Sequence, residues 1–283
     1  MTSTTLAPSA QAAPAARAAS PVRTTFGGLV RAEWIGLTSL RGTIASLIIG
    51  MALVVLPAAG IAVMYGVQYR QTGDETMLQW IPSAAGLGFG GVFFAIAVAV
   101  LIGTGIYAKE HATGALRTQL AASPRRVSTL TAKALVVAIA VFCATVVAVL
   151  LATAAAAVVL PLFDLPVGID DLAAEVILPA VGAGVFATSA AVFSLGVAAI
   201  LRSETWTTTL TIVFLFVFPM VLLNLPWEWA ASLSEILLGM TGQSLAATPL
   251  EVTGELGIDL ALTIAWALAA FAGGAIAMRL RDA

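Results

Sequence analysis

The chain alternates between long apolar stretches and short polar segments, and six of the apolar stretches are about twenty residues long or more. A helix needs about 20 apolar residues to cross the hydrocarbon layer of a bilayer, where every backbone hydrogen bond must be made within the protein. The pattern therefore predicts an all-α, polytopic membrane protein with six transmembrane helices. The predicted spans cover residues 43–65, 85–107, 128–159, 176–201, 205–225 and 257–279.

Two of the predicted spans have further features. The third span is longer than a bilayer requires, so we expect it to tilt or to project beyond the bilayer. Pro57 lies inside the first span and is expected to kink that helix, because proline removes a backbone donor and clashes with the preceding turn.

The segment before the first span predicts an interfacial amphipathic helix over residues 26–41. Its apolar side chains fall on one helical face, as in helices that lie on a membrane surface. These apolar residues are Phe26, Leu29, Val30, Leu37 and Leu40. Residues 1–25 are rich in Ala, Pro, Ser and Thr and lack the apolar core of a secretory signal, so we predict a disordered cytoplasmic tail. The membrane domain then covers residues 26–283.

A second segment that does not cross the membrane, residues 226–256, precedes the last span. Its apolar patches are too short to cross, and Trp227 and Trp229 are residue types that favour the headgroup region. We predict an outer-surface or re-entrant helical segment here.

Composition and charge agree with a membrane protein and orient it. Hydrophobic residues make up 60% of the 283 residues and charged residues 10%, whereas a soluble domain carries about 25% charged residues. If the amino terminus is cytoplasmic, twelve of the thirteen Lys and Arg residues face the cytoplasm, and eleven of the fifteen Asp and Glu residues face outward. The positive-inside rule therefore predicts that both termini are cytoplasmic. The abundance of Ala and of Arg over Lys favours a bacterial cell membrane.

The cytoplasmic loop between the second and third spans, residues 108–123, is the segment that we expect to carry function. Leu116 and Leu120 lie on one helical face, and Ser123 with Pro124 suits the start of the next helix. A short helix would present an apolar ridge edged with charge, which is costly to expose unless it packs on the membrane or a partner. The alternative interpretation is a basic loop that only sets topology. We favour a docking surface formed by Glu110, Gly114, Leu116, Arg117, Leu120, Pro124, Arg125 and Arg126.

Glu33 falls amid the apolar face of the interfacial helix, where a lone carboxylate is costly. One hypothesis is an ion pair with Arg117 of the loop or with Arg41, which would tie the interfacial helix to the docking surface. The alternatives are that the side chain extends to the headgroup region, or that the helical face is rotated from this projection. Glu33 and Arg41 are the residues that we predict to couple this helix.

Several of these segments together resemble the type-2 ATP-binding-cassette (ABC) permease family. The loop is similar to the loop signature of that family in its pattern of Glu110, Gly114, Leu116, Leu120, Ser123, Pro124, Arg125 and, later, Lys133. Residues 31–43 (RAEWIGLTSLRGT) are similar to the first helix of its actinobacterial branch. Residues 193–206 (FSLGVAAILRSETW) and Pro219 continue the resemblance, which covers nearly the whole chain after residue 25.

The resemblance implies a permease that pairs with a second permease copy and with two copies of an ABC ATPase subunit. The loop helix would be the coupling helix that docks in a groove of the ATPase, and ATP and Mg would be bound by that partner. The second and fifth spans would border a central cavity. Phe89, Phe93, Phe214 and Phe218 are candidate cavity residues, and helix packing is an equally good interpretation of them.

Motifs for autonomous chemistry are missing from the sequence. An ATP-binding loop requires a lysine after G-x-x-x-x-G, and neither Lys109 nor Lys133 follows that pattern. The span centres carry no charge of the kind that ion-driven carriers use. His111 is the single histidine and lacks companion metal ligands, and Cys143 in an apolar run is a small packing residue. We therefore predict a non-catalytic subunit without a catalytic, cofactor or metal site and without a nucleic-acid partner.

One glycine-rich segment matches a dinucleotide-binding pattern by spacing alone. Gly86, Gly88 and Gly91 fit G-x-G-x-x-G, but no strand precedes them. Close helix packing explains them better, as it does the pair Gly86 and Gly90 at GxxxG spacing.

The predicted function is the transmembrane permease subunit of an ABC exporter with a lipophilic or amphipathic substrate. The alternative is a membrane-anchored interaction or sensory protein that uses the same loop to bind a cytoplasmic partner without transport. An import permease is a further alternative.

Overall fold

The structure, a computed structural model, describes residues 25–39, 41–73, 76, 78, 81–113, 126–247 and 254–280. The helical elements are α1 (Phe26–Ser39), α2 (Arg41–Thr72), α3 (Ala84–Phe89), α4 (Val92–Thr113), α6 (Arg126–Val159), η2 (Leu160–Phe163), η3 (Ala173–Ile177), α7 (Leu178–Leu201), α8 (Glu204–Ile212), η4 (Val213–Val217), α9 (Phe218–Leu223), α10 (Glu228–Glu235), α11 (Leu238–Ala246) and α12 (Gly254–Leu280). The described residues contain no β-strand. The predicted tail lies outside them except for Thr25.

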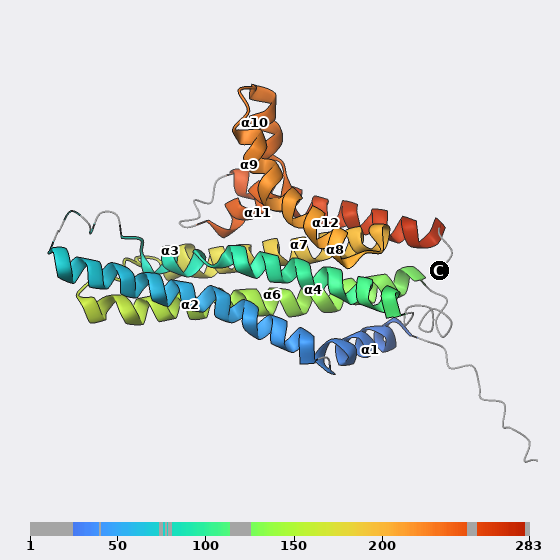
Figure 1. The fold of residues 1–283 in the computed structure, drawn as a ribbon, viewed down its shortest axis with the longest axis horizontal. Coiled ribbons are helices and arrows are strands. Elements are labelled where there is room, and N and C mark those ends of the chain that lie inside the picture. Colours follow the sequence, from blue (N-terminus) through green and yellow to red (C-terminus); the bar gives the residue numbers. More distant parts are fainter. Residues whose placement is uncertain are drawn as a thin grey trace, which may run out of the picture.

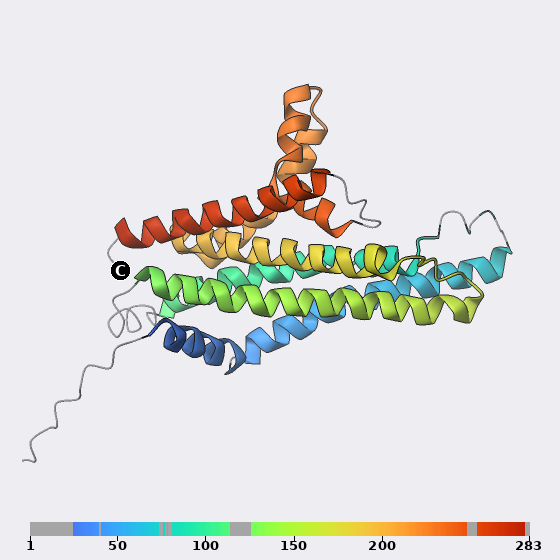
Figure 2. The same ribbon diagram turned by 180° about the vertical axis from the view of Figure 1, so that it is seen from behind.

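Six helical segments are long and apolar enough to cross a membrane, which confirms the predicted all-α, multi-pass membrane fold. They are Arg41–Thr72, Ala84–Ala108, Val127–Phe163, Ala173–Leu201, Glu204–Leu223 and Leu256–Leu280. The helix predicted before the first span is α1, which lies beside α6 in both views of the ribbon (Figures 1 and 2).

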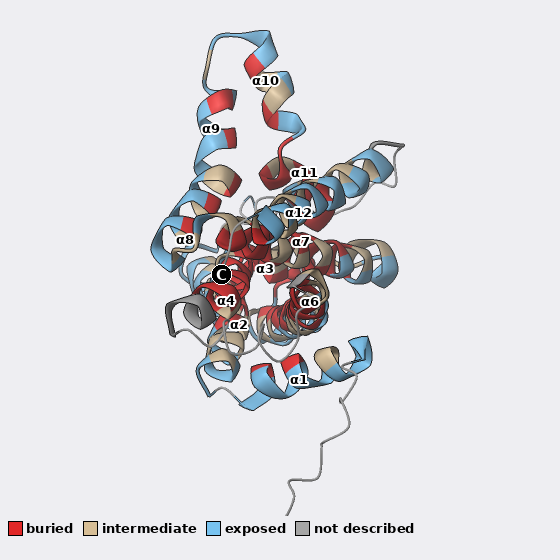
Figure 3. Cartoon of the chain, turned by 90° about the vertical axis from the view of Figure 1, so that its right-hand side faces the viewer, coloured by how far each residue is buried: buried red, intermediate tan, exposed pale blue. Residues whose placement is uncertain are grey.

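The bundle is built around α7, which contacts α4, α6, α11 and α12 and is buried along most of its length (Figure 3). Small residues allow this close approach. A Cβ atom on Gly103 of α4 would lie 2.1 Å from the carbonyl oxygen of Ala191, and one on Gly196 of α7 would lie 2.3 Å from the carbonyl oxygen of Ala270. Helices in lipid associate through such close packing, because burial of apolar surface gives little driving force there.

The helices α2 and α6 are longer than the bilayer requires. With 32 and 34 residues, they extend about 48 and 51 Å at 1.5 Å per residue, against a hydrocarbon layer of about 30 Å. The excess length was predicted for the third span and is found in the first as well. At their shared end Phe163 packs where Gly66 has no side chain, and Arg70 lies 4.8 Å over the Phe163 ring. The helix α2 continues through Pro57.

Two short π-helical turns, η3 and η4, lie in the fourth and fifth spans. Each precedes a proline, Pro179 and Pro219 respectively, by one residue. Proline leaves one carbonyl without its usual donor, and a wider turn lets a later amide bond to an earlier carbonyl. The amide of Phe218, for example, donates to the carbonyl of Val213. The fifth span therefore changes its helical register halfway along.

The glycines of the third helix pack against neighbouring helices, as predicted, but not all of them do so. A Cβ atom on Gly88 would meet Thr153 of α6 and one on Gly91 would meet the backbone of Val54 in α2. Gly86 and Gly90 approach only their own turn of the chain. The close crossings are thus at Gly88 and Gly91, and the GxxxG pair Gly86 and Gly90 does not form one.

The segment after the fifth span forms two short helices, in agreement with the predicted helical segment 226–256. The helices α9 and α10 pack on each other and stand away from the bundle as an arm (Figures 1 and 2). Trp227 and Trp229 stack at 5.6 Å on this arm and are both exposed. The next helix, α11, returns into the bundle and contacts α7 and α12.

Candidate functional site

The end of the bundle at which α4 ends, α6 begins and α12 ends is here named the loop end, and the opposite end the far end (Figure 1). The two ends differ in charge. Described basic residues at the loop end are Arg31, Arg41, Lys133, Arg202 and Arg279, against the carboxylates Glu33 and Glu204. The far end has Arg70 against Asp164, Asp170, Asp171 and Glu175. The charge difference that the sequence pattern predicts is therefore present between the two ends of the fold.

Most of the predicted docking residues lie outside the described part of the chain. These are Gly114, Leu116, Arg117, Leu120, Pro124 and Arg125, in the connection from α4 to α6. Glu110 lies in the last turn of α4 and Arg126 is the first residue of α6. The docking surface therefore stays a prediction, and the structure describes its immediate surroundings.

The helix α1 covers the side of α6 next to this connection. Thr25 caps α1 by accepting the amide of Gly28 at 3.2 Å. One stripe of α1 turns inward and buries Glu33 and Leu37. Trp34 is exposed on the same helix. The helix contacts α6 more than its sequence neighbour α2, so its position depends on what holds it to α6.

A buried ion pair joins α1 to α6. The Lys133 ammonium donates to both carboxylate oxygens of Glu33, at 2.9 Å to Oε1 and 2.8 Å to Oε2. The two side chains are 1% and 10% exposed, respectively. Removing one partner of a buried pair costs about 3–5 kcal/mol, because the other charge is left without compensation. The attachment of α1 is therefore strongly coupled to these two side chains.

The structure shows a partner for Glu33 that the sequence interpretation missed. The hypothesis named Arg117, which lies outside the described residues, and Arg41, which is exposed at the start of α2. A signal for Lys133 was present in the sequence: seven residues into α6, it is the only charged residue of that helix after Arg126. A lysine at that depth requires a compensating carboxylate, and Glu33 is the only one in α1.

The ion pair lies beside a packed cluster at the loop end. Tyr107 of α4, Leu130 of α6, Leu195 of α7 and Met278 of α12 are all buried and form one apolar cluster. Four helices are thus packed together one turn or less from Lys133. A displacement of α6 at this end has to be shared by its neighbours, because packed interiors do not deform continuously.

The larger of two cavities opens beside the ion pair. It has a volume of about 420 Å³ and lies between α1, α2, α4, α6 and the first residue of α8. Glu33, Lys133 and Glu204 are its charged lining residues, and Leu101 and Ile102 are part of its apolar wall. Its volume falls in the range of about 300–1,000 Å³ that is usual for small-molecule sites.

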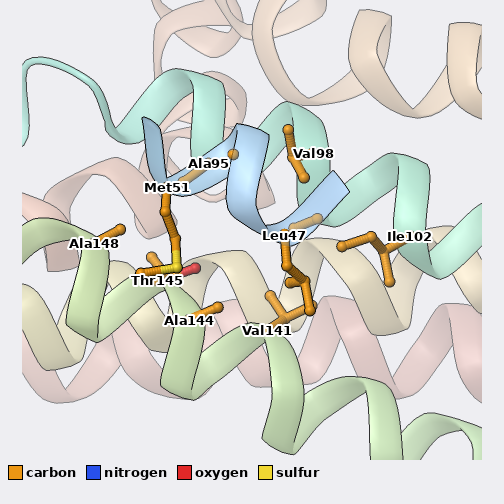
Figure 4. Close-up of a pocket in the computed structure, with 11 residues that line it drawn as sticks. Leu47, Met51, Ala95, Val98, Ile102, Val141, Ala144, Thr145 and Ala148 are labelled. Carbon is orange, nitrogen blue, oxygen red and sulfur yellow. The ribbon is translucent and has the colours of Figure 1, made fainter. Parts of the chain in front are cut away.

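The smaller cavity lies deeper, between α2, α4 and α6 (Figure 4). It measures about 20 Å³, and Thr145 contributes the one side-chain hydroxyl among residues that are otherwise apolar or glycine. A buried water needs two to four polar partners. This cavity is therefore a dry packing gap and not a ligand site.

The candidate cavity phenylalanines divide into separate groups. Phe214 stacks on Phe193 at 5.2 Å and contacts Phe218 at 6.3 Å. Phe93 contacts Phe216 at 4.3 Å, and Phe89 packs on the central apolar core. Neither cavity described above is lined by any of the four candidates.

Two of these candidates lie on the outside of the single chain. Phe93 is 50% exposed and Phe218 is 41% exposed. A cavity that includes them needs walls from another molecule, so the arrangement leaves both interpretations of these residues open.

Comparison of the sequence with family models and with curated proteins finds no match in either case. The functional argument therefore rests on the residues and their geometry.

Proposed function

We propose that the chain is the membrane-spanning permease subunit of a type-2 ABC exporter in a bacterial cell membrane, with its loop end and both termini in the cytoplasm. The observation that carries the proposal is the ion pair between Glu33 and Lys133. It fastens α1 to α6 seven residues after α6 begins, next to the connection that holds the predicted docking residues.

This arrangement suits the transmission of force from a docked partner. A partner that binds the α4–α6 connection acts on the first turns of α6. Because the pair joins α1 to α6, and Tyr107 and Leu130 join α6 to α4, these helices respond together. Allosteric coupling requires such an element whose position both sites can bias.

The energy source in this proposal is a separate ATPase with two copies per transporter, which binds ATP and Mg. The sequence has no ATP-binding loop. Lys133, the charged residue within α6, is neutralised by Glu33 and is therefore a poor site for a coupling ion. A chain of this kind depends on a partner for energy and is not itself an enzyme.

The orientation follows from the charge difference between the two ends. Basic residues that remain in the cytoplasm give the loop end its positive charge under the positive-inside rule. Residues 108–123 are then accessible to a cytoplasmic ATPase.

The substrate path in this proposal lies between two permease copies. Phe93 of α4 and Phe218 of α9 are exposed aromatic residues on the second and fifth spans. Apposition of this face with a second copy would create an aromatic-lined space for a lipophilic or amphipathic substrate. Helix packing within the dimer remains the alternative role of these rings.

Co-purification with the ATPase encoded by a neighbouring gene tests the proposal. We expect wild-type protein to retain the ATPase, and Leu116→Asp/Leu120→Asp to lose at least about tenfold of the affinity, as when an interface hot spot is removed. Leu280→Asp is the control, because Leu280 is an exposed leucine at the same end outside the docking surface. Unchanged binding of the double variant would remove the docking surface. Capture of a different partner with no ATPase would favour the interaction or sensory protein.

The orientation has its own test in a Cys143→Ser background, which removes the single cysteine. Arg31→Cys at the loop end and Asp170→Cys at the far end are both exposed positions. In intact cells a membrane-impermeant maleimide should label the cysteine at position 170 and spare that at position 31. The reverse pattern would invert the topology.

A further inference from the structure

The 420 Å³ cavity at the loop end has a polar side and an apolar side. Its polar side holds the carboxylates of Glu33 and Glu204, the Lys133 ammonium and the hydroxyls of Thr43 and Ser46. Glu33 and Lys133 form its buried floor, whereas Glu204 is exposed at its rim. The cavity thus combines a desolvated charged floor with access from outside.

The polar side presents hydrogen-bond acceptors. Lys133 directs its ammonium at both oxygens of Glu33, so its charge is directed at the wall itself. The Ser46 hydroxyl donates to the carbonyl of Gly42 at 2.9 Å, and therefore presents lone pairs to the cavity. The lining carries two carboxylates against one ammonium. A ligand with N–H donors and a positive charge complements this wall, and an anionic head group does not.

The opposite wall is apolar. Leu37, Leu101, Ile102, Ile106 and Val136 contribute aliphatic side chains from three helices. Leu101 is 47% exposed, so the apolar wall continues from the cavity onto the outer surface of α4, which faces lipid in a membrane-spanning helix. A molecule can therefore enter from the bilayer with its apolar part against α4 and its head group towards Glu204.

We propose that this cavity binds an amphiphile whose head group is a protonated amine. The ammonium lies between the Glu204 carboxylate and the hydroxyls of Thr43 and Ser46, and the apolar body lies along Leu101 and Ile102. An aminophospholipid of the bilayer and a free lipophilic amine share this chemistry. The site lies within one chain and does not require the ATPase, so it stands or fails separately from the exporter proposal.

Photolabelling tests the proposal with full-length protein in phosphatidylcholine nanodiscs. The probe is dodecylamine with a diazirine on its alkyl chain, compared with the matching dodecanol and dodecyl phosphate probes. We expect the amine to label peptides of α4 and α6 that line the cavity, and the alcohol and phosphate to label them several-fold less. Excess unlabelled dodecylamine should remove the labelling. Equal labelling by the alcohol would overturn the proposal.

Two variants separate charge from space. Glu204→Gln should weaken amine binding roughly threefold, as expected for a partly exposed ion pair, whereas Glu228→Gln, an exposed glutamate on the arm, should leave it unchanged. Ser46→Trp fills the cavity and should abolish specific labelling, whereas Ser39→Trp at an exposed position of α1 should not. Folding of each variant is checked by its elution as a single species. Unchanged labelling of a folded Ser46→Trp variant would contradict the site.

Phosphatidylethanolamine added to the nanodisc identifies the source of the amine. Competition with the probe would assign the cavity to an aminophospholipid of the bilayer. Undiminished labelling would assign it to a free lipophilic amine. Both results keep the ammonium as the recognised group.

Discussion

Two short helices, α1 and α11, pack on the same bundle by different means. A buried ion pair fastens α1 to α6 through Glu33 and Lys133. The helix α11 is instead held by close backbone contact: the carbonyl oxygen of Leu245 lies 1.7 Å from where a Cβ atom of Gly182 would be, and that of Leu215 lies 1.8 Å from the Cβ position of Gly239.

The difference separates a fixed element from one that can be released. Contacts through glycine are spread along α11, and they are lost only if the helix leaves its groove. The position of α1 depends strongly on the charges of one pair, because either charge alone would be costly in its buried place. We therefore expect α11 to behave as part of the bundle and α1 to behave as a coupled but separable element.

The largest effect is expected where α11 contacts α7. Gly182→Val places side-chain atoms on the Leu245 backbone, which cannot rotate away as a side chain can, so we expect loss of folded protein by more than about 3 kcal/mol. Size-exclusion chromatography after detergent extraction measures the folded fraction. Gly257→Val is the control, because nothing lies within 4 Å of that Cβ position. A folded Gly182→Val variant of normal stability would show that α11 is not held by this contact.

The next largest effect is expected at the ion pair. Lys133→Met leaves the Glu33 carboxylate buried without this partner and should lower the free energy of unfolding by about 3–5 kcal/mol. Glu33→Leu/Lys133→Met should recover most of that loss, because an apolar pair replaces both charges. Denaturant titration followed by tryptophan fluorescence measures both variants.

Arg31→Met is the control for the ion pair, since Arg31 is exposed on α1 and its substitution should change stability by less than about 0.5 kcal/mol. Additive effects of the two substitutions at positions 33 and 133 would contradict a direct pair.

The smallest effect is expected at the hydroxyl contact of α11. Thr263 donates to the Thr241 hydroxyl at 2.9 Å, and both side chains are buried. Thr241→Val should cost about 0.6–1.7 kcal/mol, the usual range for such bonds between membrane helices. The same denaturant titration measures it, with the exposed Thr205→Val as control. A loss as large as that of Lys133→Met would mean that α11, too, depends on one contact.

The sequence predicts the spans well because their signal is local. Each needs about twenty apolar residues, and the six observed helices cover the predicted ranges. The interfacial helix and the helical pair before the last span were also recognised from local apolar patches. Lengths beyond the bilayer are less visible: α2 continues to Thr72 past the predicted end at residue 65, because its last turns mix polar and apolar residues that lie outside the bilayer.

Contacts between distant segments were harder to predict. Glu33 was correctly singled out as a buried carboxylate, but Lys133 is 100 residues away, and helical periodicity does not identify which helix α1 covers. Gly88 and Gly91 form close crossings whereas Gly86 does not, because a spacing motif does not determine which face of a helix meets its neighbour. The cavity depends on five elements together, so no single segment indicates it.

The most direct test of the account is the rate of ATP hydrolysis by the partner ATPase, reconstituted with the chain in nanodiscs. Glu33→Gln removes the charge that binds Lys133 and should lower the stimulation of ATP hydrolysis at least about fivefold, the lower range of allosteric coupling. Glu228→Gln, on the exposed arm, should leave it unchanged. Full stimulation with a folded Glu33→Gln variant would contradict the claim that the Glu33–Lys133 pair couples α1 to the docking loop.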